Sequence, residues 1–265
     1  MNTKKKKLAA ILCTAGAVIL LGTGCIAVNS DKNKKVMNET INEGLKVLSS
    51  SYALTQLDAG EFSDMRMYGF MKFHVDQYDA EKLGNISVMT ADMGFMQMAS
   101  VVITPYEKNM PMCSLDFMYI MGNRKSYAEF YDLTGNKDSD EYKDILTSLS
   151  NMTKRYKNIE ELETEKRWYD DFSTVTMHKK LSYKNDQLNK DMFLDVLKTY
   201  ASCSSTIEKS SDEDAKMQFE ATQAYCDGLI EKGGVSTDTF KKALGEEKTR
   251  EFFNKVFFGM DNYRS

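Results

Sequence analysis

Three short segments follow one another in the middle of the sequence: Ser100-Val-Val-Ile-Thr-Pro105, Met110-Pro-Met-Cys-Ser-Leu-Asp-Phe117 and Tyr127-Ala-Glu-Phe-Tyr-Asp-Leu-Thr134. Each is rich in β-branched, aromatic or other apolar residues, and turn-forming residues separate them, as in consecutive β-strands. Strands that are joined by such short connections pair in the antiparallel sense. The three segments therefore predict the centre of an antiparallel sheet.

Short apolar runs typical of strands continue on both sides of this centre. Before and after them, the apolar residues recur at the spacing of helices. The predicted strands are Met67–Val75, Ile86–Ala91, Phe95–Thr104, Leu115–Met121, Tyr127–Leu133 and Phe172–Lys180. The predicted helices are Met37–Tyr52, Tyr142–Leu149, Phe193–Tyr200, Asp214–Ile230 and Ser236–Phe258, the last ended by Gly259. A run of strands enclosed by helices predicts a layered α+β fold with a mainly antiparallel sheet.

The N-terminus has the features of an export signal. The basic group Lys4–Lys7 is followed by Leu8–Leu21, a run of 14 apolar or small residues. A permanent membrane span needs roughly 20, whereas the length and flanks suit a secretory signal. Small residues then lead into Cys25, as in a bacterial lipobox, although Leu21 lies four residues before the cysteine rather than three. We expect residues 1–24 to be a signal peptide and Cys25 to carry lipid; the alternative, an uncleaved anchor helix, leaves the protein on the same outer side of the membrane.

The remaining sequence predicts one domain behind a short tether. The polar, lysine-rich stretch Asn29–Lys35 marks residues 25–35 as the tether, and residues 36–265 have no proline-rich linker or repeat that would divide them. The formal charge is −4; without the four lysines of the signal, 31 basic and 39 acidic residues give −8. General nucleic-acid binding requires a basic face, so this charge balance argues against it.

The sequence lacks the motifs of a disulfide framework and of a metal site. Cys113, Cys203 and Cys226 cannot all pair within one chain, which favours free, mostly buried thiols over a single disulfide. His74 and His178 belong to no metal-binding motif, so no metal site is expected. The methionines, concentrated in the predicted strands, are explained by core filling; the alternative is that they line a pocket for a large, flat, apolar ligand.

The order of these segments resembles the order of the central strands in the ferredoxin-dependent bilin reductases, a family that includes phycocyanobilin:ferredoxin oxidoreductase. In that family a strand ends in a proline, and a second proline precedes an aspartate by five residues, as Pro111 precedes Asp116 here. Further landmarks are Tyr142–Leu149, Trp168 with Phe172, Met192–Tyr200 and Gly245–Phe258. The resemblance covers roughly residues 60–260. It implies a three-layer α/β/α sandwich that holds a linear tetrapyrrole between the sheet and the C-terminal helices; red chlorophyll catabolite reductases share that fold.

The resemblance also assigns roles to residues. Asp116 corresponds to the proton donor, and in the predicted strand it shares a face with Ser114, Met118 and Ile120. This apolar setting raises a carboxyl pKa; the alternative is an aspartate that is hydrogen-bonded locally at a strand end. Ser100 and Met118 are expected to contact the bilin, and Lys166 or Arg167 lies near the family's propionate-binding arginine, although a solvated surface charge is the favoured interpretation of each.

The sequence departs from the family pattern at three positions. Ser100 stands where phycocyanobilin-forming enzymes have histidine, Met89 stands near their glutamate, and Gly234 falls where many members have an aspartate. Asp227 or Asp238 could replace that aspartate only if the loop is rearranged. The changes argue against one particular product rather than against the family.

The leading hypothesis is a bilin reductase-like protein that protonates a linear tetrapyrrole through Asp116. The family binds neither metal nor flavin, and its electrons come from ferredoxin, so an exported member needs another single-electron donor. Basic residues that could meet a donor form the cluster Lys154, Arg155 and Lys157 and the weaker pair Arg124 and Lys125. The alternatives are a non-enzymatic tetrapyrrole-binding lipoprotein and a surface lipoprotein with an unrelated partner.

Overall fold

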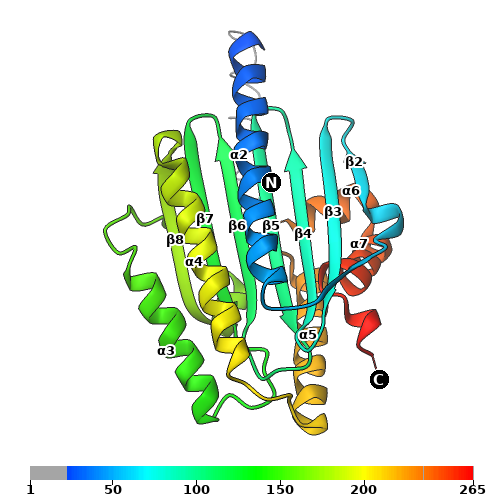
Figure 1. Ribbon diagram of the computed structural model, residues 1–265. Coiled ribbons are helices and arrows are strands. Elements are labelled where there is room, and N and C mark those ends of the chain that lie inside the picture. The colour runs from blue at the N-terminus through cyan, green and yellow to red at the C-terminus, as the bar shows by residue number, and fades with distance from the viewer. Residues whose placement is uncertain (1–22, 235, 265) are drawn as a thin grey trace.

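One antiparallel sheet forms the middle layer of the protein (Figure 1). The computed structural model describes residues 23–234 and 236–264. Its eight strands have the order β1-β3-β4-β5-β6-β7-β8, and β2 pairs with β3 on the same edge as β1. They are β1 (Leu54–Leu57), β2 (Asp64–Met67), β3 (Met71–Ala80), β4 (Gly84–Asp92), β5 (Met96–Pro105), β6 (Met112–Ile120), β7 (Asn123–Tyr131) and β8 (Ser173–Ser182). The predicted antiparallel sheet is confirmed.

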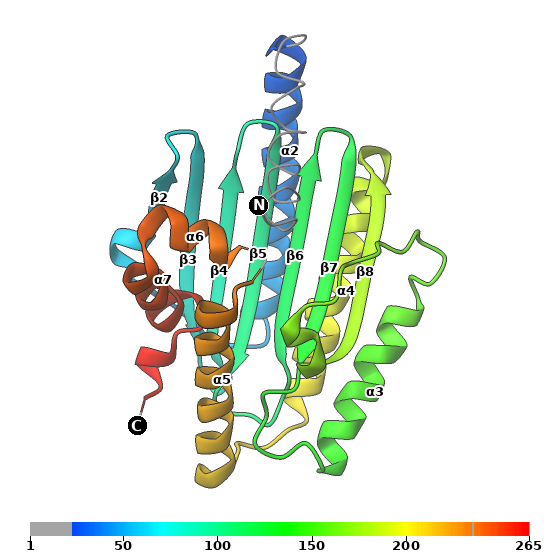
Figure 2. The same ribbon diagram turned by 180° about the vertical axis from the view of Figure 1, so that it is seen from behind.

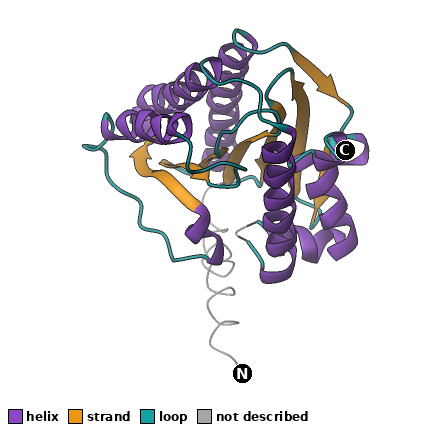
Figure 3. Ribbon diagram, turned by 90° about the horizontal axis from the view of Figure 1, so that it is seen from below, coloured by secondary structure: helices purple, strands orange, loops and turns teal. Residues whose placement is uncertain are grey.

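Helices cover both faces of the sheet (Figures 1, 2 and 3). One face, called here the α2 face, is covered by α2 (Thr23–Ser49), α3 (Asp140–Lys154) and α4 (Asp186–Ser205). The other, the α5 face, is covered by α5 (Asp212–Lys232), α6 (Thr237–Leu244) and α7 (Glu246–Phe252). The three-layer α/β/α sandwich is therefore confirmed.

Alternation along the strands divides the side chains between two cores. In β6, Leu115, Phe117 and Tyr119 pack into the core under α2 and α4. Asp116 and Met118 lie between them in sequence and point to the opposite face, because successive side chains of a strand alternate. The fold thus places the predicted proton donor on the α5 face, the side on which the resemblance places the bilin.

Two predicted elements are interrupted in the structure. The predicted strand Met67–Val75 is a hairpin, in which β2 ends at Met67 and β3 begins at Met71. The predicted C-terminal helix is divided at Gly245, whose φ of +86° ends α6, and its last turn, Phe253–Phe257, is a π-helix. Neither break changes the spacing of the apolar residues, so a prediction based on that spacing could not detect them. The short edge strand β1 was not predicted.

The prediction of a tether over residues 25–35 is wrong in conformation, because these residues belong to α2. Ser30 and Asn33 are buried, and the Asn33 side-chain amide donates to the Gln97 side-chain oxygen at 3.0 Å. Lys34 binds Asp92 at 3.2 Å. The stretch is polar because its partners at this end of the sheet are polar. The predicted signal, apart from Thr23 and Gly24, lies outside the described residues, and none of the described helices is long and apolar enough to span a bilayer.

Candidate functional site

Four polar side chains lie side by side across the α5 face. Ser100 of β5 is directly opposite Asp116 of β6, Asp116 is opposite Tyr127 of β7, and Tyr127 is opposite His178 of β8. Directly paired residues of antiparallel strands point to the same face. These residues, called here the polar row, therefore form a continuous line of hydroxyl, carboxyl, phenol and imidazole groups.

Much of the polar row is accessible. The helices α5, α6 and α7 lie over the β3–β5 side of the sheet, and in the described part of the chain no α-helix covers β6–β8 on this face (Figure 2). The short 3-10 helix Trp168–Phe172 lies over part of β6 and β7 there. Asp116, Tyr127 and His178 are accordingly half-buried, whereas Ser100, closer to the helices, is 4% exposed. Asp116, Tyr127 and His178 can therefore be contacted from this face.

An aromatic cluster borders the row on the α5 side. Trp168 and Tyr169, in the short 3-10 helix Trp168–Phe172, pack with Tyr225 of α5, and Tyr225 packs against Tyr131 of β7. The Trp168 indole nitrogen donates to the carbonyl of Gly233 at 2.7 Å, which connects this segment to the end of α5. Tyr169, Tyr225 and Tyr131 are buried, so the cluster fixes the Trp168–Phe172 segment beside the polar row, and Trp168 is the member that stays partly exposed there.

The Asp116 carboxyl has two serine donors. The Ser100 hydroxyl donates to one carboxylate oxygen, and the Ser114 hydroxyl donates to the other at 3.1 Å. Burial raises the pKa of Asp116 to about 6, although both hydrogen bonds and the positive charge of Arg167 oppose the shift. Asp116 can therefore exchange a proton close to neutral pH, as a general acid must.

Glu129 forms the charged centre next to the row. It lies two residues beyond Tyr127 on the same face of β7 and accepts hydrogen bonds from Arg167, from Tyr131 and, at 2.8 Å, from His178 Nε2. Burial alone would raise the pKa of Glu129, but the donors His178, Arg167 and Tyr131 lower it to about 2. Its permanent negative charge in turn helps to raise the pKa of Asp116.

The predicted site residues separate into two groups. Ser100, Asp116 and Met118 share the α5 face, and Arg167 reaches it through its contact with Glu129. Lys166 does not: its side chain is 77% exposed and pairs with Asp171 at 3.1 Å. Lys166 is therefore a surface charge, the interpretation that the sequence favoured for that position.

The structure also shows the surroundings of the positions that depart from the family pattern. Met89 is opposite Ser100 on β4 and is buried, so it extends the polar row with an apolar side chain. Gly234 lies between α5 and α6, close to Thr237 and Leu229. Asp227 is bound by Arg250, and Asp238 lies in the first turn of α6 beside Gly233.

Sequence reasoning missed Tyr127, Glu129 and His178 as members of this site. The alternation Tyr127, Glu129, Tyr131 along one strand was a usable signal, because it places three polar groups on the face of Asp116. His178 gave no such signal, since its neighbour Glu129 is 49 residues away in sequence. The basic pair Arg124 and Lys125 was also misread: Arg124 is 1% exposed and bound to Asp186, so it cannot meet a partner.

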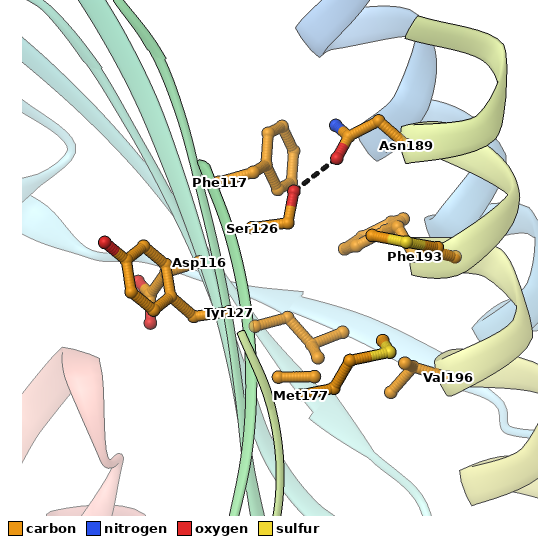
Figure 4. Close-up of a pocket in the computed structure, with 11 residues that line it drawn as sticks. Asp116, Phe117, Ser126, Tyr127, Met177, Asn189, Phe193 and Val196 are labelled. Atoms are coloured by element: carbon orange, nitrogen blue, oxygen red, sulfur yellow. Dashed lines mark hydrogen bonds between the residues drawn. The ribbon is translucent and has the colours of Figure 1, made fainter. Parts of the chain in front are cut away.

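A small cavity of about 20 Å³ lies on the other side of the sheet, under α4. Figure 4 shows Phe117, Ser126 and Met177 facing α4 across it, whereas the side chains of Asp116 and Tyr127 extend from the opposite side of the strands. A single water-sized molecule fills such a volume. This cavity is therefore not a bilin site, and among the described residues no cluster of His, Cys, Asp or Glu suits a metal ion.

Comparison with known proteins identifies the fold. No protein-family model and no curated protein sequence matches the chain. Among solved structures, a crystal structure of selenomethionine phytochromobilin synthase from tomato in complex with biliverdin superimposes with a TM-score of 0.71, over 85% of this chain and 83% of the other, at 14% identity. The chain has the fold of phytochromobilin synthase. The fold implied by the bilin reductase landmarks is thereby confirmed.

We expect the substitution Glu129→Gln to lower the free energy of unfolding at pH 7 by about 1.5–3 kcal/mol, because it removes the charge that holds three donors. The pKa of Glu129 is about 2 in the folded protein against 4.5 normally, so its stabilising contribution is present above pH 4.5 and is lost as the pH falls toward 2. Urea unfolding at pH 7 and pH 3 measures both effects.

The matched control is Glu160→Gln, which removes an ion pair with Lys180 at 2.8 Å in which the Glu160 side chain is 64% exposed. Exposed pairs are worth about 0–1 kcal/mol. Equal losses in the two variants would contradict a special role for Glu129.

Proposed function

We propose that this protein binds a linear tetrapyrrole over the polar row and reduces it in single-electron steps, with Asp116 as the proton donor. The observation that carries the proposal is the half-buried Asp116, with a pKa of about 6, at the centre of an accessible face in this fold. The similar structure of phytochromobilin synthase contains biliverdin, which supports a ligand of this class.

The chemistry assigned to the chain is proton transfer and positioning. Reduction of one double bond consumes two electrons and two protons, and the electrons come from an external single-electron donor such as a ferredoxin. Asp116 delivers a proton to the bilin radical, and its pKa of about 6 allows it to take up another from solvent. Tyr127 and His178, the next members of the row, lie with ring centroids 5.3 Å apart and offer further polar contacts to the ligand.

Arg167 is the positive group available to a bilin propionate. It is shared between Glu129 and Asp170, whose Oδ1 is 2.8 Å from Arg167 Nε, and its side chain remains 20% exposed. A guanidinium has five N–H donors, so Arg167 can keep these partners and still bind a carboxylate. Met118 contacts the ligand from the sheet in this arrangement, and Ser100, which is buried, acts on the site through its hydrogen bond to Asp116.

The proposal is tested by the absorbance spectrum of the full chain mixed with biliverdin, with and without a chemical reductant. Loss of the long-wavelength band only when protein and reductant are both present supports the reductase. A spectrum that is unchanged under every condition would contradict both binding and reduction.

A second candidate is a tetrapyrrole-binding protein without catalysis. The observation in its favour is the segment between α5 and α6, where Gly234 replaces the aspartate of many bilin reductases and the nearby Asp227 is held by Arg250. The same spectrum discriminates, because a binder shifts and sharpens the biliverdin band without bleaching it when the reductant is added.

We also propose that the protein is exported and attached to the outer face of the cell membrane through lipid on Cys25. The support is the sequence of residues 1–25, with its basic group, apolar run and cysteine. We expect Cys25→Ser to release the protein from the membrane fraction or to block its maturation, as measured by fractionation and lipid labelling. A variant that remains in membranes and still incorporates lipid would show that Cys25 is not the site.

A further inference from the structure

Large apolar side chains are exposed together at one end of the molecule. The turns β2–β3, β4–β5 and β6–β7 and the segment after β8 all lie at the upper end in Figure 1. Each exposes at least one such residue. These five residues, called here the hairpin end, are Tyr68 (54% exposed), Phe70 (56%), Phe95 (37%), Met121 (47%) and Tyr183 (48%).

At two of these positions the turn geometry disfavours the residue that is present. Tyr68 has a φ of +51° and Met121 a φ of +54°, the left-handed region in which glycine, asparagine and aspartate are favoured and a bulky residue is strained. Both positions are also exposed to solvent, where an apolar residue gains nothing from burial. A bulky residue in a left-handed backbone conformation is strained, and its apolar side chain is exposed to water. Residues of this kind indicate a surface that contacts a partner outside the chain.

The first turns of α2 connect these tips to the N-terminal segment. Lys34 of α2 binds Asp92 at the start of the β4–β5 turn at 3.2 Å, and Lys32 lies 5.7 Å from the ring centroid of Tyr183. The backbone N–H of Tyr183 donates to the carbonyl of Gly122 in the β6–β7 turn at 2.9 Å. Since α2 begins at this end, the attachment proposed at Cys25 in its first turn lies at the same end as the tips.

The charge around the hairpin end is positive although the whole chain carries −4. Exposed cations lie beside the tips: Lys32, Arg66, Lys72 and Lys184. The nearby acids have partners of their own: Asp31 and Asp92 pair with Lys34, Asp186 with Arg124, and Asp64 with His74. Aromatic and apolar side chains ringed by cations are complementary to the interface of a bilayer that contains anionic lipids.

We propose that the hairpin end docks on a lipid bilayer, with its aromatic and methionine side chains at the headgroup level and its cations against anionic headgroups. The sheet then stands on the membrane by one end, and the attachment at the N-terminus of α2 keeps this end facing the lipid. This contact is independent of any tetrapyrrole, and it holds the domain in one orientation whether the attachment is lipid on Cys25 or an uncleaved helix.

The test places a single added tryptophan at the hairpin end of the full chain, as Phe70→Trp or Phe95→Trp. The protein is reconstituted in vesicles of equal phosphatidylcholine and phosphatidylglycerol, with or without bromine on the acyl chains. The fluorescence of the wild type, which has Trp168, is subtracted. We expect bromine to quench the added fluorescence roughly twofold, because interfacial docking buries side chains by about 5–10 Å, at the boundary of the acyl chains.

The matched control is Met217→Trp. Met217 is 49% exposed and belongs to the N-terminal part of α5, which lies at the opposite end of the molecule (Figure 2). A tryptophan there should be insensitive to the bromine. Equal quenching at positions 70, 95 and 217, or no quenching at 70 and 95, would overturn the proposal. Circular dichroism verifies the fold, and Tyr183→Trp provides a further position if either hairpin variant misfolds.

Discussion

Asp116→Asn is expected to lower bilin turnover by at least about 100-fold while biliverdin binding stays close to that of the wild type. Asparagine keeps the shape of aspartate and its hydrogen-bonding capacity, but it has no transferable proton. General acid catalysis is typically worth about 100- to 10,000-fold. Reduction should therefore stop after one electron, and a long-lived bilin radical should be detectable by electron paramagnetic resonance.

The pH dependence provides a second readout of the same group. Because the pKa of Asp116 is raised to about 6, its acid form is populated below that pH, and the wild-type rate should decrease as the pH rises through 6. The Asn variant should lack this dependence. A matched control is Asp79→Asn: Asp79 is half-buried on β3 and accepts a hydrogen bond from Tyr263, away from the polar row. Wild-type rates in Asp116→Asn would exclude Asp116 as the donor.

Phe253→Ala is expected to lower the free energy of unfolding by about 3–5 kcal/mol, the cost of emptying a fully buried phenylalanine site. Phe253 is 3% exposed, in the π-helical turn after α7. Its ring lies 5.5–5.8 Å, centroid to centroid, from three others, those of Phe252, Phe257 and Phe258. Alanine removes the whole ring from this cluster, and urea unfolding followed by circular dichroism measures the loss.

Phe70→Ala is the control for that measurement, because Phe70 is 56% exposed at the β2–β3 turn and should change the stability in solution very little. Near-identical midpoints for Phe253→Ala and the wild type would mean that the C-terminal segment does not pack as the structure places it. The two phenylalanines differ in surroundings and not in chemistry, so the comparison isolates burial.

The sheet was predictable because its signal is local. The central strands alternate or run apolar over their whole length, as in β5 and β6, and turn residues mark their ends. The same local signal failed at two kinds of position. A tight turn inside an apolar run, such as Tyr68–Phe70, does not disturb the pattern, and Gly245 breaks the C-terminal helix without changing which face is apolar.

The candidate site was predictable in part. Strand alternation placed Asp116 and Met118 on one face, and the family landmarks added Ser100 to the site; in the structure all three lie on that face. Lys166 and Arg167 are adjacent in sequence, so no sequence argument could choose between them. Only Arg167 turns toward Glu129, while Lys166 pairs with Asp171 at the surface.

The sequence by itself determined the class of fold, the face on which Asp116 lies and the apolar and basic character of the N-terminus, because each depends on residues close together in the chain. The tertiary structure decided which distant groups meet. His178 and Arg167 reach Glu129 only because β8 and the segment before it pair beside β7, and four turn segments share one end only because antiparallel strands return to it. Contacts of this kind depend on strand order and register, which no local pattern of residues encodes.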